Sequence, residues 1–373
     1  MKILINHTDI YIGGAEIELR SLADYMSAKG FDITVAAMPS NMDLFRSAFS
    51  PKVKCIRARL VKCTHKNRFI RILHAIIRKI YRCLIVTYLN TQKYDVSIAF
   101  IEGLPSIDAL QVKAKSYLAW IHCDLRHFNA QQYIQSCFSS IAEEKMIYQK
   151  YDKVVCVSET AKTGFIETIG DTGNLCVKYN PINWIDIQKK SKEPCPAVKN
   201  NNRSLIVTIG TLGTVKNYGT LLEAVNLLKD KVPFDVWMIG KGGSEEEKLK
   251  QYAKENKLNN VYFLGYQKNP YPYLLQADLF VSTSISESYG LAVQEALILG
   301  KPVIAVRCEG IEEAFDECFG RLINNSAQEL ADNIKSLLEC PSELHAYSKA
   351  IKENYSTDSL YEERMDKICQ LIK

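Results

Sequence analysis

The feature that most constrains the fold of this chain is a repeated alternation of short apolar runs and longer amphipathic segments. Lys2–Asn6 is expected to form a buried strand, and residues 16–29 place their apolar side chains on one helical face at a 3.6-residue period. Gly30 ends this helix, and Ile33–Ala37 is the next apolar run. A strand, a helix and a second strand in this order predict a parallel sheet, because parallel neighbours need a long crossover connection.

The same alternation continues along the chain and predicts an α/β protein of two domains, as a length of 373 residues also suggests. The segment 191–203 is polar, holds two prolines and lacks apolar periodicity, so we expect a linker there. Doubly wound domains are therefore expected at 1–190 and 204–355, followed by a last helix at 356–373. Further strands are expected at 96–100, 117–121, 154–157, 205–209, 235–239, 261–264, 279–281 and 303–306, and helices at about 124–148, 159–168, 219–229, 245–255 and 291–299. Ligands of such sheets bind beyond the carboxyl ends of the strands, so a cleft between the domains is the expected site.

A basic segment, 52–93, distinguishes the first domain from the rest of a chain whose composition is otherwise ordinary. It holds twelve of the 47 Lys and Arg residues and no acid. Its part 66–88 is expected to form a helix with an apolar stripe (Phe69, Ile72, Leu73, Ile76, Ile80 and Leu84) and a basic side (Arg68, Arg71, Arg78, Lys79 and Arg82). We expect this helix to contact an anionic membrane surface. A helix packed on its own sheet with a solvated basic face is the alternative, and nothing elsewhere indicates nucleic-acid binding.

The amino-terminal residues and the pattern of cysteines indicate in which cell compartment the protein is found. The first apolar run is too short for a signal-peptide core or a membrane span. The twelve cysteines form no C-x-x-C pair, so neither a zinc site nor a disulfide framework is indicated. We therefore expect a cytoplasmic protein that segment 52–93 holds peripherally at the inner face of the cell membrane.

Two acidic residues flank the start of the helix expected at 291–299. Glu287 precedes this helix and Glu295 lies within it. The backbone N–H groups from about Tyr289 to Ala292 can hold a phosphate or a hydroxyl-rich ligand, and carboxylates accept hydrogen bonds from vicinal hydroxyls of a sugar or a ribose. Acids are also favoured at any helix N-terminus by capping and by the helix dipole, and this interpretation remains open.

Three other strand ends carry candidate residues. The turn Gly210–Asn217 contains two glycines and Lys216, which suits a polyphosphate although the turn is no Walker motif. Gly13–Gly14 allows close approach of a ligand to the backbone, or is simply a turn. His122 ends a strand and is expected to point into the cleft, although a lone histidine is more often structural.

Taken in order, these segments resemble the family 4 glycosyltransferases of the GT-B fold. The members of this family have two Rossmann-like domains that face a cleft, and they transfer a sugar from a nucleotide diphosphate sugar with retention of configuration. The resemblance runs nearly from end to end. It is carried by Gly13–Glu16, Trp120–Asp124, Val157–Glu159, Asn180–Ile182 and, most specifically, the E-x7-E stretch 287–295 with Gly300–Ile304.

The resemblance implies a retaining hexosyltransferase. The basic apolar segment of the first domain suits a lipid-linked saccharide acceptor, and we therefore expect a role in bacterial surface polysaccharide synthesis. The resemblance also implies catalytic roles for His122, near the reacting carbon, and for Glu287, on hydroxyls of the donor sugar. Glu295 would hold the ribose and Lys216 the diphosphate. The remaining donor-binding residues that it implies are Gly14, Thr211, Ser288, Tyr289, Gly290 and Leu291, with Tyr266 and Gln267 near the base.

The sequence departs from the family at Thr211, where an arginine is usual, so diphosphate binding would depend more on Lys216 and the helix N-terminus. No Asp-x-Asp occurs to hold a metal ion, and we expect neither a metal nor another cofactor. The last helix would cross back to the first domain. Two other functions remain open: a nucleotide-sugar epimerase of the same architecture, and a non-catalytic membrane-surface protein with a degenerate nucleotide cleft.

Overall fold

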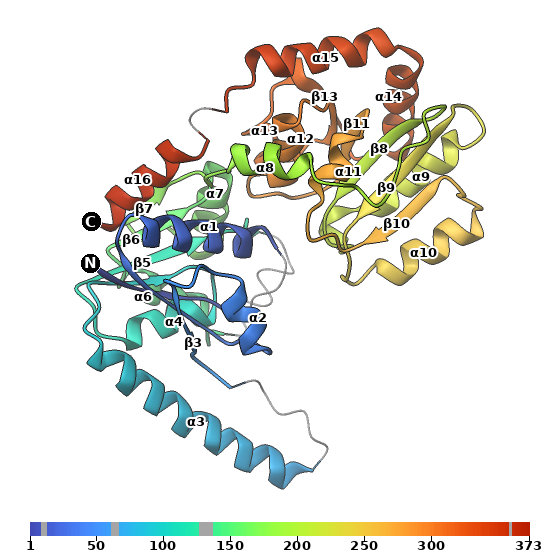
Figure 1. Ribbon diagram of the computed structural model, residues 1–373. Helices are drawn as coiled ribbons and strands as arrows, with labels where there is room; N and C mark the ends of the chain where they lie inside the picture. The colour runs from blue at the N-terminus through green and yellow to red at the C-terminus, as the bar shows by residue number, and fades with distance from the viewer. Residues whose placement is uncertain (9–12, 61–66, 127–136, 358–359) are drawn as a thin grey trace. The chain divides into compact units, whose positions relative to one another are not determined.

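The computed structural model describes residues 1–373 except 9–12, 61–66, 127–136 and 358–359 (Figure 1). The chain divides into two compact units. Unit 1 comprises residues 1–181 together with 362–373, and unit 2 comprises residues 182–361. Each unit is described by itself below.

Unit 1 is built on a seven-stranded parallel sheet of order β3-β2-β1-β4-β5-β6-β7. The strands are β1 (Lys2–Asn6), β2 (Asp32–Ala37), β3 (Lys54–Arg57), β4 (Val96–Ala99), β5 (Ser116–Ile121), β6 (Lys153–Cys156) and β7 (Leu175–Val177). The helices are α1 (Gly14–Ala28), α2 (Met42–Ser47), α3 (Arg68–Thr91), α4 (Leu104–Gln111), α6 (Ile141–Tyr148), α7 (Glu159–Ile169) and α16 (Glu362–Ile372). The central strands are almost continuously buried, as expected when helices cover both faces of a parallel sheet.

Unit 2 is built on a six-stranded parallel sheet of order β10-β9-β8-β11-β12-β13. Its strands are β8 (Ser204–Ile209), β9 (Phe234–Ile239), β10 (Val261–Gly265), β11 (Leu279–Ser282), β12 (Val303–Val306) and β13 (Gly320–Ile323). Its helices are α8 (Trp184–Ser191), α9 (Tyr218–Leu228), α10 (Glu246–Glu255), α11 (Tyr271–Leu275), α12 (Leu291–Ile298), α13 (Glu309–Glu312), α14 (Ala327–Glu339) and α15 (Pro341–Asn354). Two apolar clusters, one containing α9 and α14 and the other containing α11 and α12, form its core.

Both sheets reverse their strand order, between β1 and β4 in unit 1 and between β8 and β11 in unit 2. The prediction of two doubly wound parallel α/β domains is therefore confirmed. In such sheets the carboxyl ends of the strands at the reversal are the usual place for a ligand. In unit 2 these ends carry the turn after β8 and the loop after β11, where Lys216 and Glu287 are found.

The structure divides the chain earlier than expected. Helix α8 falls within the range 1–190 that we assigned to the first domain, yet it contacts α11 and α12 and belongs to unit 2. The segment 192–203 contains neither helix nor strand, but it also lies within unit 2. There the Lys199 ammonium pairs with Asp278, so this segment is part of the unit rather than a linker. The last helix begins at Glu362, later than residue 356, and lies in unit 1 against α1.

Some elements differ from their expected form. The helix expected at 124–148 is represented by α6 alone, and residues 127–136 lie outside the described part of the chain. Strands β3, β7 and β13 were not predicted. In the described residues no helix combines the length and the apolar character needed to cross a membrane. No disulfide joins any of the cysteines that the structure describes.

Candidate functional site

The turn after β8 brings Lys216 back over the end of its own strand. The chain passes from Ile209 through Gly210 into a short 3-10 turn at Thr214–Lys216, and α9 then begins at Tyr218. A Cβ added at Gly210 would lie 3.1 Å from Cε of Lys216 and 2.8 Å from the hydroxyl oxygen of Tyr218. A larger residue at position 210 would therefore have to displace the ends of these two side chains.

The Lys216 ammonium forms an ion pair with Glu287, with Nζ and Oε1 2.5 Å apart. Two hydrogen bonds hold the two segments together: the Thr283 hydroxyl donates to the Lys216 carbonyl at 2.8 Å, and the N–H of Ile285 donates to the Val215 carbonyl at 3.0 Å. Burial acts to lower the pKa of Lys216, but the Glu287 carboxylate outweighs it, so the pKa lies above its usual value. The structure thus brings together two residues that the sequence analysis selected independently.

The start of α12 is shaped by two glycines. Gly290, with φ of 66°, occupies the left-handed region that favours glycine, and it immediately precedes Leu291. A Cβ at Gly310 would lie 1.9 Å from the Glu287 carbonyl oxygen, so α13 packs directly against the backbone at Glu287. No side chain caps α12. The N–H of Val293 donates to the Gly290 carbonyl at 2.9 Å. N–H groups before it in the first turn of a helix have no intrahelical acceptor, and such an end favours anions.

Residue Glu295 lies on the second turn of α12 and is partly buried. Its carboxylate accepts a hydrogen bond from the Tyr271 hydroxyl at 3.1 Å. Burial raises the pKa of Glu295 to about 7, although the bond from Tyr271 and the charge of Lys216 both act to lower it. A carboxyl group that titrates near neutrality can exchange its proton for hydrogen bonds from a ligand's hydroxyls.

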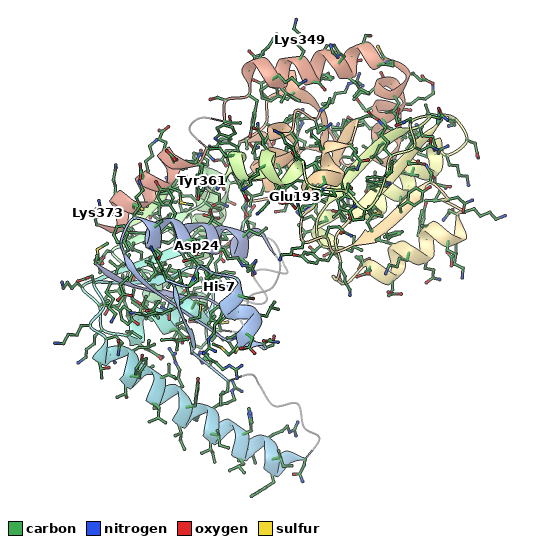
Figure 2. All side chains as sticks on the ribbon, viewed as in Figure 1. His7, Asp24, Glu193, Lys349, Tyr361 and Lys373 are labelled. Carbon is green, nitrogen blue, oxygen red and sulfur yellow. The ribbon has the colours of Figure 1, made fainter. Side chains whose placement is uncertain are left out.

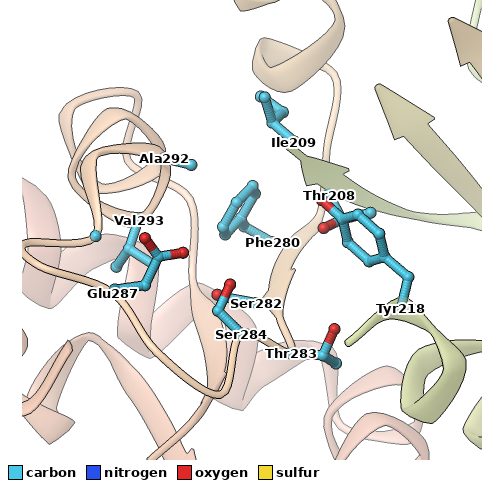
Figure 3. A pocket seen from close by; sticks show the side chains of 11 residues that line it. Thr208, Ile209, Tyr218, Phe280, Ser282, Thr283, Ser284, Glu287, Ala292 and Val293 are labelled. Carbon is cyan, nitrogen blue, oxygen red and sulfur yellow. The ribbon is translucent and has the colours of Figure 1, made fainter. Parts of the chain in front are cut away.

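A pocket lies beside Glu287, within unit 2 (Figure 3). Figure 3 shows the Glu287 carboxylate near the hydroxyls of Ser282 and Ser284, with Thr208 and Tyr218 on the opposite wall. The pocket is small, about 10 Å³, so within unit 2 it has room for no more than one hydroxyl-sized group of a ligand. The hydroxyls on both walls and the carboxylate at one side suit such a group.

The other predicted donor-binding residues of unit 2 do not take part in the contact between Lys216 and Glu287. Ser288 and Tyr289 follow Glu287, and Tyr289 is buried. Thr211 lies within the turn after β8, where its short side chain supplies no cation. Gln267, expected near a base, is engaged within unit 2: it donates to the Leu264 carbonyl at 2.7 Å and accepts from the Tyr273 hydroxyl at 2.9 Å. Tyr266 is exposed.

Three residues near the site, Tyr218, Tyr271 and Gly310, were not predicted from the sequence. The signals for Gly310 and Tyr218 were weak, because a single glycine after β12 and a tyrosine opening a helix are common features. Tyr271 follows Pro270 in an aromatic run, which marks a short helix start but gives no sign of its partner on α12.

Gly14 and His122 lie in unit 1, and their approach to the unit 2 residues stays a prediction. Gly14 is the first residue of α1, and Gly13, the N-cap of this helix, separates it from the undescribed residues 9–12. His122 follows the last residue of β5, but its side chain is buried inside unit 1, with 7% of it exposed. Its Nδ1 lies 3.6 Å from Oε2 of Glu18, a carboxyl group on α1 that is itself buried.

The surroundings of His122 keep ionisable groups neutral. Burial and the nearby His7 lower the pKa of His122 to about 3, with the Phe100 carbonyl acting in the opposite direction. Burial raises the pKa of Glu18 well above its usual value. The carboxylate of Glu102 accepts the backbone N–H groups of His122 and Cys123 and so fixes the end of β5. A neutral imidazole can accept or donate a hydrogen bond but carries no charge to the reaction.

Metal binding was not expected from the sequence. Among the residues that the structure describes, no group of three or more His, Cys, Asp or Glu side chains is arranged to hold a metal ion. Independence from metals stays a prediction, since a substrate can also bring a metal ion with it.

Comparison with known proteins gives a consistent result. Residues 189–354 match the family model for glycosyl transferases group 1. A Campylobacter jejuni relative, an N-acetylgalactosamine-N,N'-diacetylbacillosaminyl-diphospho-undecaprenol 4-alpha-N-acetylgalactosaminyltransferase, is 25% identical over 227 residues, which cover 59% of this chain and 60% of that protein. The alpha-monoglucosyldiacylglycerol synthase of Acholeplasma laidlawii is 25% identical over 392 residues, covering 97% of this chain and 93% of that protein. The chain spans about three-fifths of the length of the first curated relatives that it matches.

Among solved structures, the Anabaena protein HepE in complex with UDP and glucose superimposes with a TM-score of 0.78. The superposition covers 100% of this chain and 99% of that chain, at 18% sequence identity. At this identity the likeness shows the fold, which is the GT-B fold over the whole chain.

Proposed function

Because residues 189–354 match the family model for glycosyl transferases group 1 and the chain has the GT-B fold, we propose that this protein is a glycosyltransferase. It transfers a hexose-type sugar from a nucleotide diphosphate sugar to a saccharide acceptor. The observation that carries the proposal is the Lys216–Glu287 ion pair beside the uncapped start of α12. A cation and free N–H groups suit a diphosphate, and a carboxylate suits the hydroxyls of the attached sugar.

Each residue of this site has a proposed role. Lys216 and the first turn of α12 neutralise the charge that develops on the departing diphosphate. Glu287 binds hydroxyls of the donor sugar, and Glu295 binds the ribose. Because the ammonium and the carboxylate are paired without a ligand, the donor exchanges this pairing for its own contacts: the diphosphate takes Lys216 and the sugar takes Glu287.

The reaction proceeds with retention, as in family 4. No carboxylate of the site is assigned as a nucleophile, so the acceptor attacks on the face from which the diphosphate leaves. The departing phosphate oxygen then takes the acceptor's proton. His122 and Gly14 keep the roles that the family resemblance implies, and the neutral His122 imidazole contributes hydrogen bonding rather than charge.

The acceptor is proposed to be lipid-linked, at the inner face of a bacterial cell membrane, in surface polysaccharide synthesis. The names of the Campylobacter and Acholeplasma relatives specify a diphospho-undecaprenol-linked saccharide and a diacylglycerol glycolipid. Both are membrane lipids. The exposed apolar side of α3 supports the same location for this chain.

The side of α3 that faces away from unit 1 is apolar. All six residues of the stripe are about half exposed or more, from 49% for Leu73 to 73% for Phe69. The opposite side is anchored: Leu89 is buried in the core, and Arg82 pairs with Asp108 at 2.9 Å. Figures 1 and 2 show the N-terminal part of α3 extending beyond the rest of unit 1. The stripe itself therefore does not pack on the sheet of unit 1, although the C-terminal part of α3 does so through Leu89, and we propose a bilayer surface as the partner of the stripe.

A binding and turnover assay tests the activity. Uridine, guanosine and adenosine diphosphates and their sugars are screened by thermal shift, since a ligand that binds the native state raises the melting temperature. We expect one nucleotide to stabilise the protein, and Lys216→Ala and Glu287→Ala to remove that shift together with slow hydrolysis of the matching nucleotide sugar. Lys248→Ala, on the exposed face of α10, is the matched control.

The same assay distinguishes the alternatives. Interconversion of sugar epimers with no free sugar released would identify an epimerase. Nucleotide binding without any turnover, in the presence of membrane lipid extracts as acceptor source, would identify a non-catalytic protein. Absence of a shift with all nucleotides would contradict the proposal.

A further inference from the structure

A second groove lies at the opposite edge of the unit 2 sheet from the pocket. Residues that come just before the strands line it: Ser204 starts β8, Asp278 precedes β11, and Lys301 precedes β12. Since these strands are parallel, their amino ends share one edge, whereas Lys216 and Glu287 follow the carboxyl ends. Helix α15 supplies the other wall, with His345 and Ser348. The volume of the groove, about 500 Å³, lies within the range of small-molecule sites.

The groove has one acidic side chain, Asp278, and its carboxylate already forms an ion pair with a lysine. Asp278 Oδ2 accepts from the Lys199 ammonium and also from the N–H of Leu205, at 2.7 Å in the latter case. Arg203, another lining residue, pairs outside this cluster with Asp235 at 2.7 Å and also donates to the Phe234 carbonyl. Neither Asp278 nor Asp235 is therefore left to neutralise a further cation.

Lys301 is that further cation. It is partly buried, and its ammonium makes no hydrogen bond or ion pair with any residue in the described ranges of the chain. Burial lowers the pKa of Lys301 to about 8; Asp278 acts to raise it, and the charges of Lys199 and Lys352 lower it further. The Lys352 side chain runs close by, since its Cε lies 3.6 Å from where a Cβ on Gly300 would be.

Three lysines thus converge on an edge where only one has a carboxylate partner. Partial burial of an uncompensated ammonium is unfavourable, and it becomes favourable when an anion enters the groove. We propose that this groove is a second ligand site, which binds a compact phosphate-bearing anion through Lys301, flanked by Lys199 and Lys352. The Ser348 hydroxyl and the His345 imidazole line the same space and can donate to phosphate oxygens.

This site is independent of the proposed glycosyl transfer, because none of its residues belongs to the pocket beside Glu287. It gives the nucleotide-binding unit a place where a soluble phosphate compound or a lipid phosphate headgroup could bind away from the donor. The two sources share the same recognition chemistry, which is one or two phosphate groups held by lysine ammonium groups.

The test measures binding of inorganic pyrophosphate, the probe, to the full chain by isothermal titration calorimetry. We expect Lys301→Ala to weaken pyrophosphate binding at the groove at least about tenfold, equivalent to 1.4 kcal/mol, and Lys352→Ala to weaken it less. Lys248→Ala and Lys254→Ala on α10 are matched controls that leave binding unchanged. Lys301→Ala should also keep or raise the melting temperature without anion, because it removes a repelled charge.

Lys216→Ala separates this site from the donor pocket. Pyrophosphate binding that survives Lys216→Ala and is lost with Lys301→Ala supports the groove, even if no nucleotide binds anywhere. Binding that is lost with Lys216→Ala and unaffected by Lys301→Ala overturns it. A second arm titrates monomeric short-chain phosphatidic acid into the full chain, so that vesicle contact through α3 does not contribute: binding that is lost with Lys301→Ala assigns the anion to lipid, and pyrophosphate binding without phosphatidic acid binding assigns it to a soluble compound.

Discussion

At the scale of single residues, the candidate site depends on ionisable groups whose charges are adjusted by burial and by one another. Lys216 keeps its charge because Glu287 is 2.5 Å away, whereas Glu295, with a neutral tyrosine as its hydrogen-bond partner, has its pKa raised to about 7. The two acids of one helix start therefore behave differently. Glu287 is tied to a cation, and Glu295 is close to its titration midpoint at neutral pH.

We predict that a nucleotide diphosphate sugar binds more weakly as the pH falls below about 7. The free protein then holds a proton on Glu295, and this proton must leave before the carboxylate can accept from the ribose hydroxyls. If one proton must be released on binding, the affinity falls by up to about tenfold, or 1.36 kcal/mol, for each pH unit below the pKa of Glu295. Calorimetry at about pH 8 and about pH 5.5 measures the effect. The diphosphate diester of the ligand stays ionised across this range, so its own titration does not contribute.

The matched variant for this prediction is Glu295→Gln, which preserves the size of the side chain. It should bind weakly at both pH values and show no dependence on pH in this interval. Equal affinity of the unmodified protein at both values would show that Glu295 is not in contact with the ligand.

The sequence was sufficient to select Lys216, Glu287 and Glu295, because strand ends, glycine turns and helix starts have recognisable residue types. It was not sufficient to pair Lys216 with Glu287, since the two are brought together only by the parallel pairing of β8 with β11. Nor did it predict the buried partner of His122. Glu18 follows Ile17 on α1 and looks like a surface acid, and only the packed structure shows that it is buried.

At the scale of elements, the strands with continuous apolar runs were predictable and the short edge strands were not. β3 lies inside the basic segment, with Lys54 exposed, and β7 has only three half-buried residues at the other edge of the sheet. An edge strand is hydrogen-bonded to a neighbouring strand on one side only and is less buried than a central strand. Its sequence therefore carries a weaker apolar pattern. Helix α3 was predictable in extent, but its orientation was not, because the anchor Asp108 lies on another element.

That anchor changes the interpretation of the basic side of α3. Asp108 is buried and pairs with both Arg59 and Arg82, and Arg82 also donates to the Gln111 side chain at 3.0 Å. Arg82 therefore fixes the helix to unit 1 rather than facing a membrane. Arg71 and Lys79 remain available for anionic headgroups, and nothing is described of the Arg68 side chain.

We predict that Phe69→Ser combined with Leu73→Ser and Ile76→Ser abolishes sedimentation with vesicles that contain anionic phospholipid. These side chains are exposed, so their replacement removes membrane contact at little cost to folding. Arg71→Glu combined with Arg78→Glu and Lys79→Glu should weaken sedimentation at least about a hundredfold, at about 1 kcal/mol for each basic residue lost.

Leu44→Ser provides the matched control for the vesicle experiment, since Leu44 on α2 is 69% exposed but lies outside the basic segment. It should sediment like the unmodified chain, and circular dichroism should confirm that every variant is folded. Sedimentation that is equal for all variants would exclude α3 as the membrane contact.

At the scale of the whole molecule, the chain forms two units and passes from one to the other twice, after residue 181 and after residue 361. Unit 1 includes a helix from the very end of the chain: α16 contributes buried Met365, Ile368, Cys369 and Ile372, and Asp366 accepts from the Tyr25 hydroxyl of α1 at 2.9 Å. Burial of each large apolar side chain contributes about 1.5–3 kcal/mol. Unit 1 therefore depends on residues that follow unit 2 in the sequence.

This arrangement predicts that a nucleotide and the last helix stabilise different units. Lys216, Glu287 and Glu295 all belong to unit 2, so a bound nucleotide at about a hundred times its Kd should add about 2.7 kcal/mol there. Hydrogen exchange should then show slower exchange in β8 and α12 on binding.

A chain truncated after Tyr361 lacks α16, so the amides of α1 and β1 should exchange faster, while the nucleotide still protects β8 and α12. Asp366→Ala, which removes the bond from Tyr25 and the ion pair with Lys29 but keeps the buried apolar side chains of α16, should have a much smaller effect than the truncation. Loss of nucleotide protection in the truncated chain would mean that donor binding requires an intact unit 1, and it would contradict the assignment of the diphosphate and ribose contacts to unit 2.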